Sequence, residues 1–195
     1  MTTLRLSSVL PDANIWVSQT LHSWFALIAA ETTGSWSFYW TEDIMAEAVK
    51  GRRRRFVKSS SKQMEDVRDR LLAIFGENKI TRYPYDDSVT YSDKFDAHVH
   101  SAAVHAGIAM VVTENTKDFE NLYEDPDDRP YDLLRADEWL MIAADSAPAE
   151  VDAVIRLQHA YWSRRGEPFN LVKKLQGAKC PDFAEYVGSR LQRIL

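Results

Sequence analysis

The sequence predicts an α/β protein in which helices cover both faces of a mostly parallel sheet. Short apolar segments typical of strands alternate with amphipathic segments typical of helices up to about residue 136. This order favours parallel strands, because parallel neighbours need a crossover connection that is usually a helix. Beyond residue 137 only helical segments follow. We therefore expect one domain over residues 1–136 and a C-terminal helical extension over residues 137–195, packed on the same domain.

Local patterns predict each element of this domain. Residues 5–10 form a short apolar strand, and apolar residues from Ile15 to Ile28 recur at helical spacing until Gly34 ends the helix. Thr41 suits a helix N-cap, because the next two residues are acidic and complement the helix dipole. The elements expected after Gly34 are a strand over 35–40, helices over about 42–57 and 61–75, a strand over 79–84, a helix from Asp96 to Gly107 capped by Asp96, and strands over 108–113 and 131–136.

Composition limits the classes of protein to which the chain can belong. Hydrophobic residues make up 45% of the chain and charged residues 27%, which is typical of a soluble globular domain. The single Cys180 cannot form an internal disulfide, which fits a reducing compartment. We find no signal peptide pattern and no apolar run of membrane-spanning length, so we expect a cytoplasmic protein with no membrane partner.

Four acidic residues are predicted to converge on one cleft. Ligands of parallel sheets bind beyond the carboxyl ends of the strands, and acids at strand-to-helix junctions meet there although they lie far apart in the sequence. Clustered carboxylates repel one another unless a cation joins them, and hard oxygen ligands select Mg²⁺ or Mn²⁺. The four candidates are Asp12, Glu47, Asp96 and Asp118.

Three segments resemble the motifs of the PIN-domain ribonucleases, in the order in which that family has them. They are VLPDANIWVS, TEDIMAEAVKGRRRR and SDKFDAHVHSAAVHAGIAMVVTENTKDF. The last segment is the most specific, because it joins an aspartate that opens a small-residue helix to a closing T-x-N-x-x-D-F motif. The matching residues are Asp12 and Asn14 in the first segment, Glu47 in the second, and Asp96, Thr113, Asn115, Asp118 and Phe119 in the third.

The resemblance implies a three-layer α/β/α fold and a metal-dependent ribonuclease. The four acids would hold Mg²⁺ or Mn²⁺, which polarises the scissile phosphate and activates a water, and Asn14, Thr113 and Asn115 would support them by hydrogen bonding. Many bacterial members of the family are VapC-like toxins, so the resemblance also implies a small antitoxin partner. The family and the many aromatic residues suggest a homodimer.

A basic run offers a contact for the RNA backbone. The net charge of the chain is −5, yet Arg52, Arg53, Arg54 and Arg55 follow one another on the helix that carries Glu47. We predict that these arginines bind RNA phosphates without specificity for the RNA sequence. A solvated helix face or an antitoxin-binding surface is the alternative interpretation of the same run.

Other functions remain open from the sequence alone. The chain could be a catalytically weak PIN-like module that binds RNA or protein and has a regulatory role. An α/β phosphohydrolase of small molecules is disfavoured, because Asn14 stands where a D-x-D motif has its second aspartate. Single residues also have ordinary interpretations: Asp12 and Asp118 suit turns, and Glu47 suits a solvated helix face.

The remaining candidates are expected to be structural. His98, His100 and His105 lack the H-E-x-x-H spacing, so we predict surface or partly buried side chains rather than metal ligands. Two residues depart from the family's pattern. Pro11 could shift the backbone before Asp12, and Glu114 is expected to face away from phosphate by strand alternation. The aromatic residues expected in the core or in a dimer contact are Trp16, Trp24, Trp36, Phe38 and Trp40.

Overall fold

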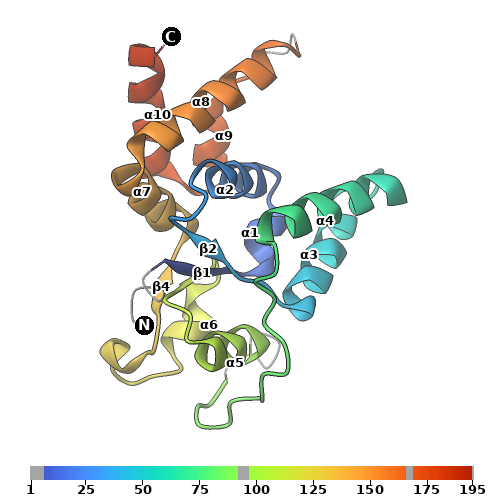
Figure 1. The fold of residues 1–195 in the computed structure, drawn as a ribbon, viewed down its shortest axis with the longest axis vertical. Helices are drawn as coiled ribbons and strands as arrows, with labels where there is room; N and C mark the ends of the chain where they lie inside the picture. Colours follow the sequence, from blue (N-terminus) through green and yellow to red (C-terminus); the bar gives the residue numbers. More distant parts are fainter. Residues whose placement is uncertain (1–6, 92–96, 166–168, 195) are drawn as a thin grey trace. The chain divides into compact units, whose positions relative to one another are not determined.

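The computed structural model describes residues 7–91, 97–165 and 169–194. These residues form two compact units. Unit 1 consists of the described parts of residues 1–17 and 34–135, and unit 2 consists of residues 18–33 and the described parts of residues 136–195. Figure 1 shows the strands of unit 1 in its middle, with α5 and α6 below them in the view.

The sheet of unit 1 has four strands, all parallel, in the order β2-β1-β3-β4. Leu10 pairs with Val111, and Pro11 pairs with Val112, so β1 and β3 end level with each other. All four residues of β1 are buried, as expected of a central strand in a parallel sheet. With the helices that surround it, the sheet confirms the three-layer α/β/α class. The strands are β1 (Ser8–Pro11), β2 (Ser37–Phe38), β3 (Met110–Val112) and β4 (Asp132–Leu134).

The helices of unit 1 begin where the sequence places good caps. The Thr41 side chain accepts a hydrogen bond from the backbone N–H of Ile44, which confirms its predicted role. Ser60 and Gln63 form a reciprocal capping box at the start of α4. The helices are α1 (Ala13–Val17), α3 (Glu42–Arg55), α4 (Ser61–Phe75), α5 (Ala97–Ala106) and α6 (Thr116–Glu120), with a 3-10 turn at Pro126–Asp128.

A glycine allows α3 to approach α1. A Cβ atom added at Gly51 would lie 2.5 Å from Cγ2 of Val17, closer than side-chain carbons pack. The buried Arg52 strengthens the same contact, because its Nη1 donates a hydrogen bond to the carbonyl oxygen of Trp16 at 2.9 Å. Trp16 in turn packs edge-on against Phe75 of α4. These contacts fix the position of the helix that carries Glu47.

Two predicted elements differ in the structure, and a third cannot be compared. The expected helix from Ile15 to Ile28 is broken at Ser18, whose hydroxyl accepts a bond from the N–H of Leu21 and starts a new helix. Segment 79–84 is not a strand but forms a single bridge between Lys79 and Trp40. The cap expected at Asp96 lies outside the described residues.

The described residues of unit 2 form helices and no strand. Aromatic pairs make its core: Trp24 packs edge-on against Phe183, and Phe25 stacks on Trp139 at a ring distance of 4.5 Å. Cys180 is buried, and its thiol lies 3.6 Å from the carbonyl oxygen of Ala178. The helices are α2 (Gln19–Glu31), α7 (Ala136–Ser146), α8 (Pro148–Ser163), α9 (Leu171–Gly177) and α10 (Pro181–Ile194).

Two buried aspartates join the helices of unit 2. Asp137 of α7 accepts hydrogen bonds from the backbone N–H groups of Asp182 and Phe183, and so caps the start of α10. Asp152 of α8 receives two hydrogen bonds from the guanidinium of Arg190 on α10. Both carboxylates are therefore used in holding α10 in place. None of the described helices is long and apolar enough to cross a membrane.

Candidate active site

The candidate site lies where β1 and β3 end side by side. Asp12 follows β1 and Thr113 follows β3, and the backbone N–H of Asp12 still donates to the carbonyl oxygen of Val112 at 2.9 Å. The Thr113 hydroxyl donates to Oδ2 of Asp12 at 2.8 Å. Adjacent parallel strands that end level thus bring together two residues that are 101 positions apart.

Asn14 closes a network around this pair. Its amide nitrogen lies 2.6 Å from Oδ2 of Asp12 and 2.8 Å from the hydroxyl of Thr113, and donates toward both. Its carbonyl oxygen accepts from the backbone N–H of Glu114 at 3.2 Å. On the other side, the N–H of Ala13 donates to Oδ1 of Asp12 at 2.6 Å. The Asp12 carboxylate is therefore held in one orientation by three neighbours.

Burial raises the pKa of Asp12 above its ordinary range. The residue is only 4% exposed, and the loss of hydration is the largest cause of the shift. The hydrogen bonds from Thr113 and Ala13 act in the opposite direction, since they stabilise the charged form. The charge of Glu47 raises the pKa further, and His98 lowers it. The network thus reduces the cost of the buried charge without removing it.

Glu47 and His98 form a second pair close enough to act on Asp12. Nε2 of His98, on α5, lies 3.4 Å from Oε2 of Glu47, on α3. Glu47 is the family-like helical glutamate, whereas sequence spacing did not connect His98 with the site. The pairing depends on how α3 and α5 pack, so no local pattern in the sequence could have revealed it.

Asn115 and Asp118 lie just beyond this network. The N–H of Asn115 donates to the Thr113 hydroxyl at 3.0 Å, and its side-chain amide donates to Oδ2 of Asp118, in the first turn of α6. Phe119 is buried, as expected of a residue that returns to the core. The motif T-x-N-x-x-D is therefore a linked chain of hydrogen bonds that runs from Asp12 toward Asp118.

The residues around Asp12 suit a hard cation in chemistry. A carboxylate has about four lone-pair positions, and the described residues use three of those on Asp12, which leaves one on Oδ1 as far as these residues go. Among the described residues, no Lys or Arg side chain forms an ion pair with Asp12. The described ranges contain no group of three or more His, Cys, Asp or Glu side chains that could hold a metal, and Asp96 lies outside them.

The two departures from the family's pattern now have locations. Pro11 ends β1 beside β3; its missing N–H would point toward β2, which has already ended at Phe38. It therefore removes no hydrogen bond from the sheet. Glu114 lies in a bend after β3, so strand alternation does not decide where its half-buried side chain points.

The four predicted phosphate-binding arginines are divided by the structure. Arg53, Arg54 and Arg55 are exposed at the C-terminal end of α3. Arg52 is buried against the end of α1, and burial lowers its pKa. Only the three exposed guanidinium groups are open to an RNA backbone, while Arg52 holds two helices together.

The histidines follow the expectation in part. His105 is exposed and His98 partly buried, but His100 is completely buried, with Nδ1 2.7 Å from the hydroxyl of Tyr131 and Nε2 3.3 Å from Oδ2 of Asp86. Loss of hydration lowers the pKa of His100, although Asp86 acts in the opposite direction. His100 of α5 thus forms a polar network with Tyr131 and Asp86.

Comparison with known families supports the motifs. Residues 8–117 match the family model described as PIN domain, which covers more than half of the chain and includes Asp12, Glu47 and Thr113. No curated protein and no solved structure is significantly similar to the chain.

Proposed function

The chain belongs to the PIN domain family, whose members are generally nucleases, and we propose that it is a metal-dependent ribonuclease that hydrolyses RNA phosphodiester bonds. The observation that carries this proposal is the buried Asp12 carboxylate, which Asn14 and Thr113 orient at the level ends of β1 and β3. A structural aspartate at such a junction would not need an acidic neighbour such as Glu47, whose charge raises its pKa.

Asp12, Glu47, Asp96 and Asp118 are the proposed ligands of Mg²⁺ or Mn²⁺. When bound, the ion supplies a Lewis acid for the scissile phosphate and a nucleophilic water at neutral pH. The chain's own residues hold the ligands in place. Thr113 and Asn14 orient Asp12, Asn115 orients Asp118, and His98 holds Glu47.

We also propose that the protein is the toxin of a type II toxin–antitoxin pair, with a small antitoxin protein and a second copy of the chain as partners. RNA is brought to the acids by the exposed Arg53, Arg54 and Arg55, whose phosphate contacts give salt-dependent binding. Growth arrest on expression, relieved by a short neighbouring gene product, tests this part.

Cleavage of a structured RNA in Mn²⁺ or Mg²⁺ is the direct test. The purified chain should cleave, and Asp96→Asn or addition of EDTA should abolish cleavage. Asp127→Asn is a matched control, because Asp127 is exposed at the 3-10 turn. Equal cleavage by wild type and Asp96→Asn would show that the proposed site is wrong.

A binding module without catalysis is the second candidate. It is favoured by one observation, namely that the described residues alone supply no group of three metal-binding side chains. Metal-independent RNA binding with no cleavage of any RNA tested would support it against the nuclease.

A further inference from the structure

A stack of aromatic rings and cations lies at the junction of α8 and α9 in unit 2. The Trp162 and Phe169 rings are parallel, with centroids 3.8 Å apart, and Tyr161 meets Trp162 edge-on at 5.1 Å. The Arg165 guanidinium lies 4.6 Å from the centre of the Tyr161 ring, and Lys174 lies 5.8 Å from the centre of Phe169. We call Tyr161, Trp162, Arg165, Phe169 and Lys174 the stacking ladder.

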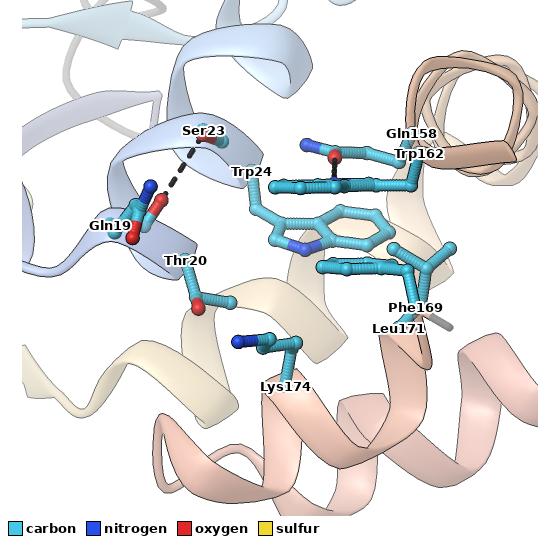
Figure 2. A pocket seen from close by; sticks show the side chains of 9 residues that line it. All are labelled: Gln19, Thr20, Ser23, Trp24, Gln158, Trp162, Phe169, Leu171 and Lys174. Carbon is cyan, nitrogen blue, oxygen red and sulfur yellow. Dashed lines mark hydrogen bonds between the residues drawn. The ribbon is translucent and has the colours of Figure 1, made fainter. Parts of the chain in front are cut away.

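The ladder is a fixed structure. Nε1 of Trp162 donates to Oε1 of Gln158, one turn earlier on α8, at 3.2 Å, which sets the plane of the indole. Figure 2 shows the Trp162 and Phe169 rings among the residues that line a small pocket, with the Trp24 ring overlapping them in the view and Lys174 below Phe169. This pocket has a volume of about 50 Å³, which is room for a few waters.

A larger groove opens next to the same rings. It has a volume of about 410 Å³ and is lined by Trp162 and Phe169 together with residues of α9 and α10, among them Asn170 and Leu191. Its size is within the range of ligand-binding clefts. The Trp162 and Phe169 rings therefore line two neighbouring hollows rather than being enclosed in the core.

The outer part of the ladder is exposed and cationic. Tyr161 is 47% exposed, although a large aromatic ring is normally covered. Arg164, Arg165, Lys173 and Lys174 are exposed around it. Among the described residues no carboxylate lies within ion-pair distance of these four side chains. This surface therefore combines flat apolar rings with positive charge that no carboxylate of the described residues neutralises.

We propose that the stacking ladder binds single-stranded RNA. A base stacks on the exposed Tyr161 ring, the next base contacts the Trp162–Phe169 pair, and Arg165 and Lys174 contact the phosphates. Positive charge alone would serve an acidic protein equally well, but ordered ring planes beside guanidinium and ammonium groups match bases joined by phosphates. The choice of RNA rather than DNA rests on the proposed ribonuclease function.

Binding of a fluorescent 12-nucleotide oligouridylate to the full chain tests the ladder. Asp12→Asn is the parent, so that the probe is not cleaved during fluorescence anisotropy measurements. We expect Tyr161→Ala to weaken binding by at least about fivefold, since one stacked base contributes roughly that much or more. Arg165→Ala should weaken binding by about fivefold and lower the salt dependence by about one phosphate contact. Tyr161→Phe should bind as the parent does.

Two matched controls lie one turn before the ladder on α8. Leu157→Ala removes an apolar side chain as exposed as Tyr161, at 46% against 47%, and Arg156→Ala removes an exposed cation. Both should bind the oligonucleotide within twofold of the parent. Melting temperatures of all variants should agree with that of the parent, because the substituted side chains are exposed.

Several outcomes would overturn the inference. These are unchanged binding by Tyr161→Ala, absence of parent binding, equal binding of an abasic strand with the same number of phosphates, and equal displacement of the probe by polyglutamate. The last result would indicate an acidic protein partner instead. If binding depends on the ladder but wild type cleaves no RNA, the RNA-binding proposal stands and the nuclease proposal is contradicted. If wild type cleaves RNA but binding does not depend on the ladder, the nuclease proposal stands and the RNA-binding proposal is contradicted.

Discussion

Asp12 in unit 1 and Asp152 in unit 2 are two aspartates with little exposed surface in opposite electrostatic settings, and Asp12 lies deeper in its unit. They are 4% and 7% exposed. Asp152 receives two hydrogen bonds from Arg190, and these bonds lower its pKa. Among the described residues, those that donate hydrogen bonds to Asp12 are all neutral, and burial raises its pKa.

The difference concerns where the compensating charge comes from. Unit 2 carries its own cation, so Asp152 is complete within the fold and serves to join α8 to α10. Asp12 is held as firmly, yet its charge is met by dipoles and opposed by Glu47. A buried anion of this kind is stabilised by any cation that enters from outside, which is the physical basis for proposing a metal there.

The largest expected effect is the loss of RNA cleavage on substitution of Asp12. Asp12→Asn should lower RNA cleavage by at least about a hundredfold, because a ligand of the proposed ion is lost. Its melting temperature without metal should change little, since relief of the buried charge offsets the loss of the bond from Ala13. Asp152→Asn should do the opposite, with cleavage retained and a lower melting temperature. Cleavage rates and thermal melts of both variants measure this, and equal losses of activity would contradict it.

A smaller effect concerns the residues that orient Asp12. Thr113→Val and Asn14→Ala should each lower cleavage by about 10- to 100-fold, as loss of groups that hold metal ligands commonly does. The reduction should be partly recovered at high Mn²⁺, which a titration of rate against Mn²⁺ measures. Thr33→Val is the control, because Thr33 is exposed. Full activity of both variants at low Mn²⁺ would show that the network has no part in catalysis.

In unit 2 the next effect concerns stability and comes from Asp137, which caps the start of α10. Asp137→Ala leaves the N–H groups of Asp182 and Phe183 without their acceptor, and should lower the free energy of unfolding by about 1–2 kcal/mol. Urea denaturation followed by circular dichroism measures this loss. Asp137→Asn retains one acceptor oxygen, so its free energy of unfolding should lie between those of wild type and Asp137→Ala. A variant as stable as wild type would mean that the cap contributes nothing.

The smallest effect is a difference in pH dependence. Asp12 has a raised pKa in the folded state, so folding takes up a proton between about pH 3.9 and that pKa, and stability falls as the pH rises through this window. The pKa of Asp152 is lowered, so its contribution is lost as the pH falls below about 3.9. In EDTA, Asp12→Asn should remove the loss of stability that accompanies rising pH. Asp152→Asn should remove the loss of stability that accompanies falling pH. Unfolding free energies measured from pH 3 to 7 check both signs.

Local signals in the sequence were sufficient for much of the fold. Thr41 marks a helix start through chemistry that acts within one turn, and it caps α3 where this was expected. The break at Ser18 was missed because the apolar periodicity continues on both sides of it. Segment 79–84 has strand-like residues, but it lies beside a β2 of only two residues, so a single bridge is all that forms.

The contact between Asp12 and Thr113 in the candidate site could be predicted because it depends on strand ends. Asp12 and Thr113 each follow a strand, and parallel neighbours bring such residues together. His98 and Arg52 depend on which helix faces pack, and this is not encoded in spacing. A run of four arginines does not reveal which guanidinium is covered, and here Gly51 decides it by letting α3 lie against α1.

The break at Ser18 also has a consequence for the order of synthesis. The chain enters unit 2 at α2, returns to unit 1 at Gly34, and makes the remaining helices of unit 2 only after Arg135. Trp24 and Phe25 therefore emerge from the ribosome more than a hundred residues before Phe183 and Trp139, against which they pack. A fragment cut after residue 136 would carry these two rings without their partners, so the nuclease-like part cannot be obtained by truncation alone. Removing α2 as well, with Val17 joined to Gly34 by a short linker, is the cut that the packing indicates.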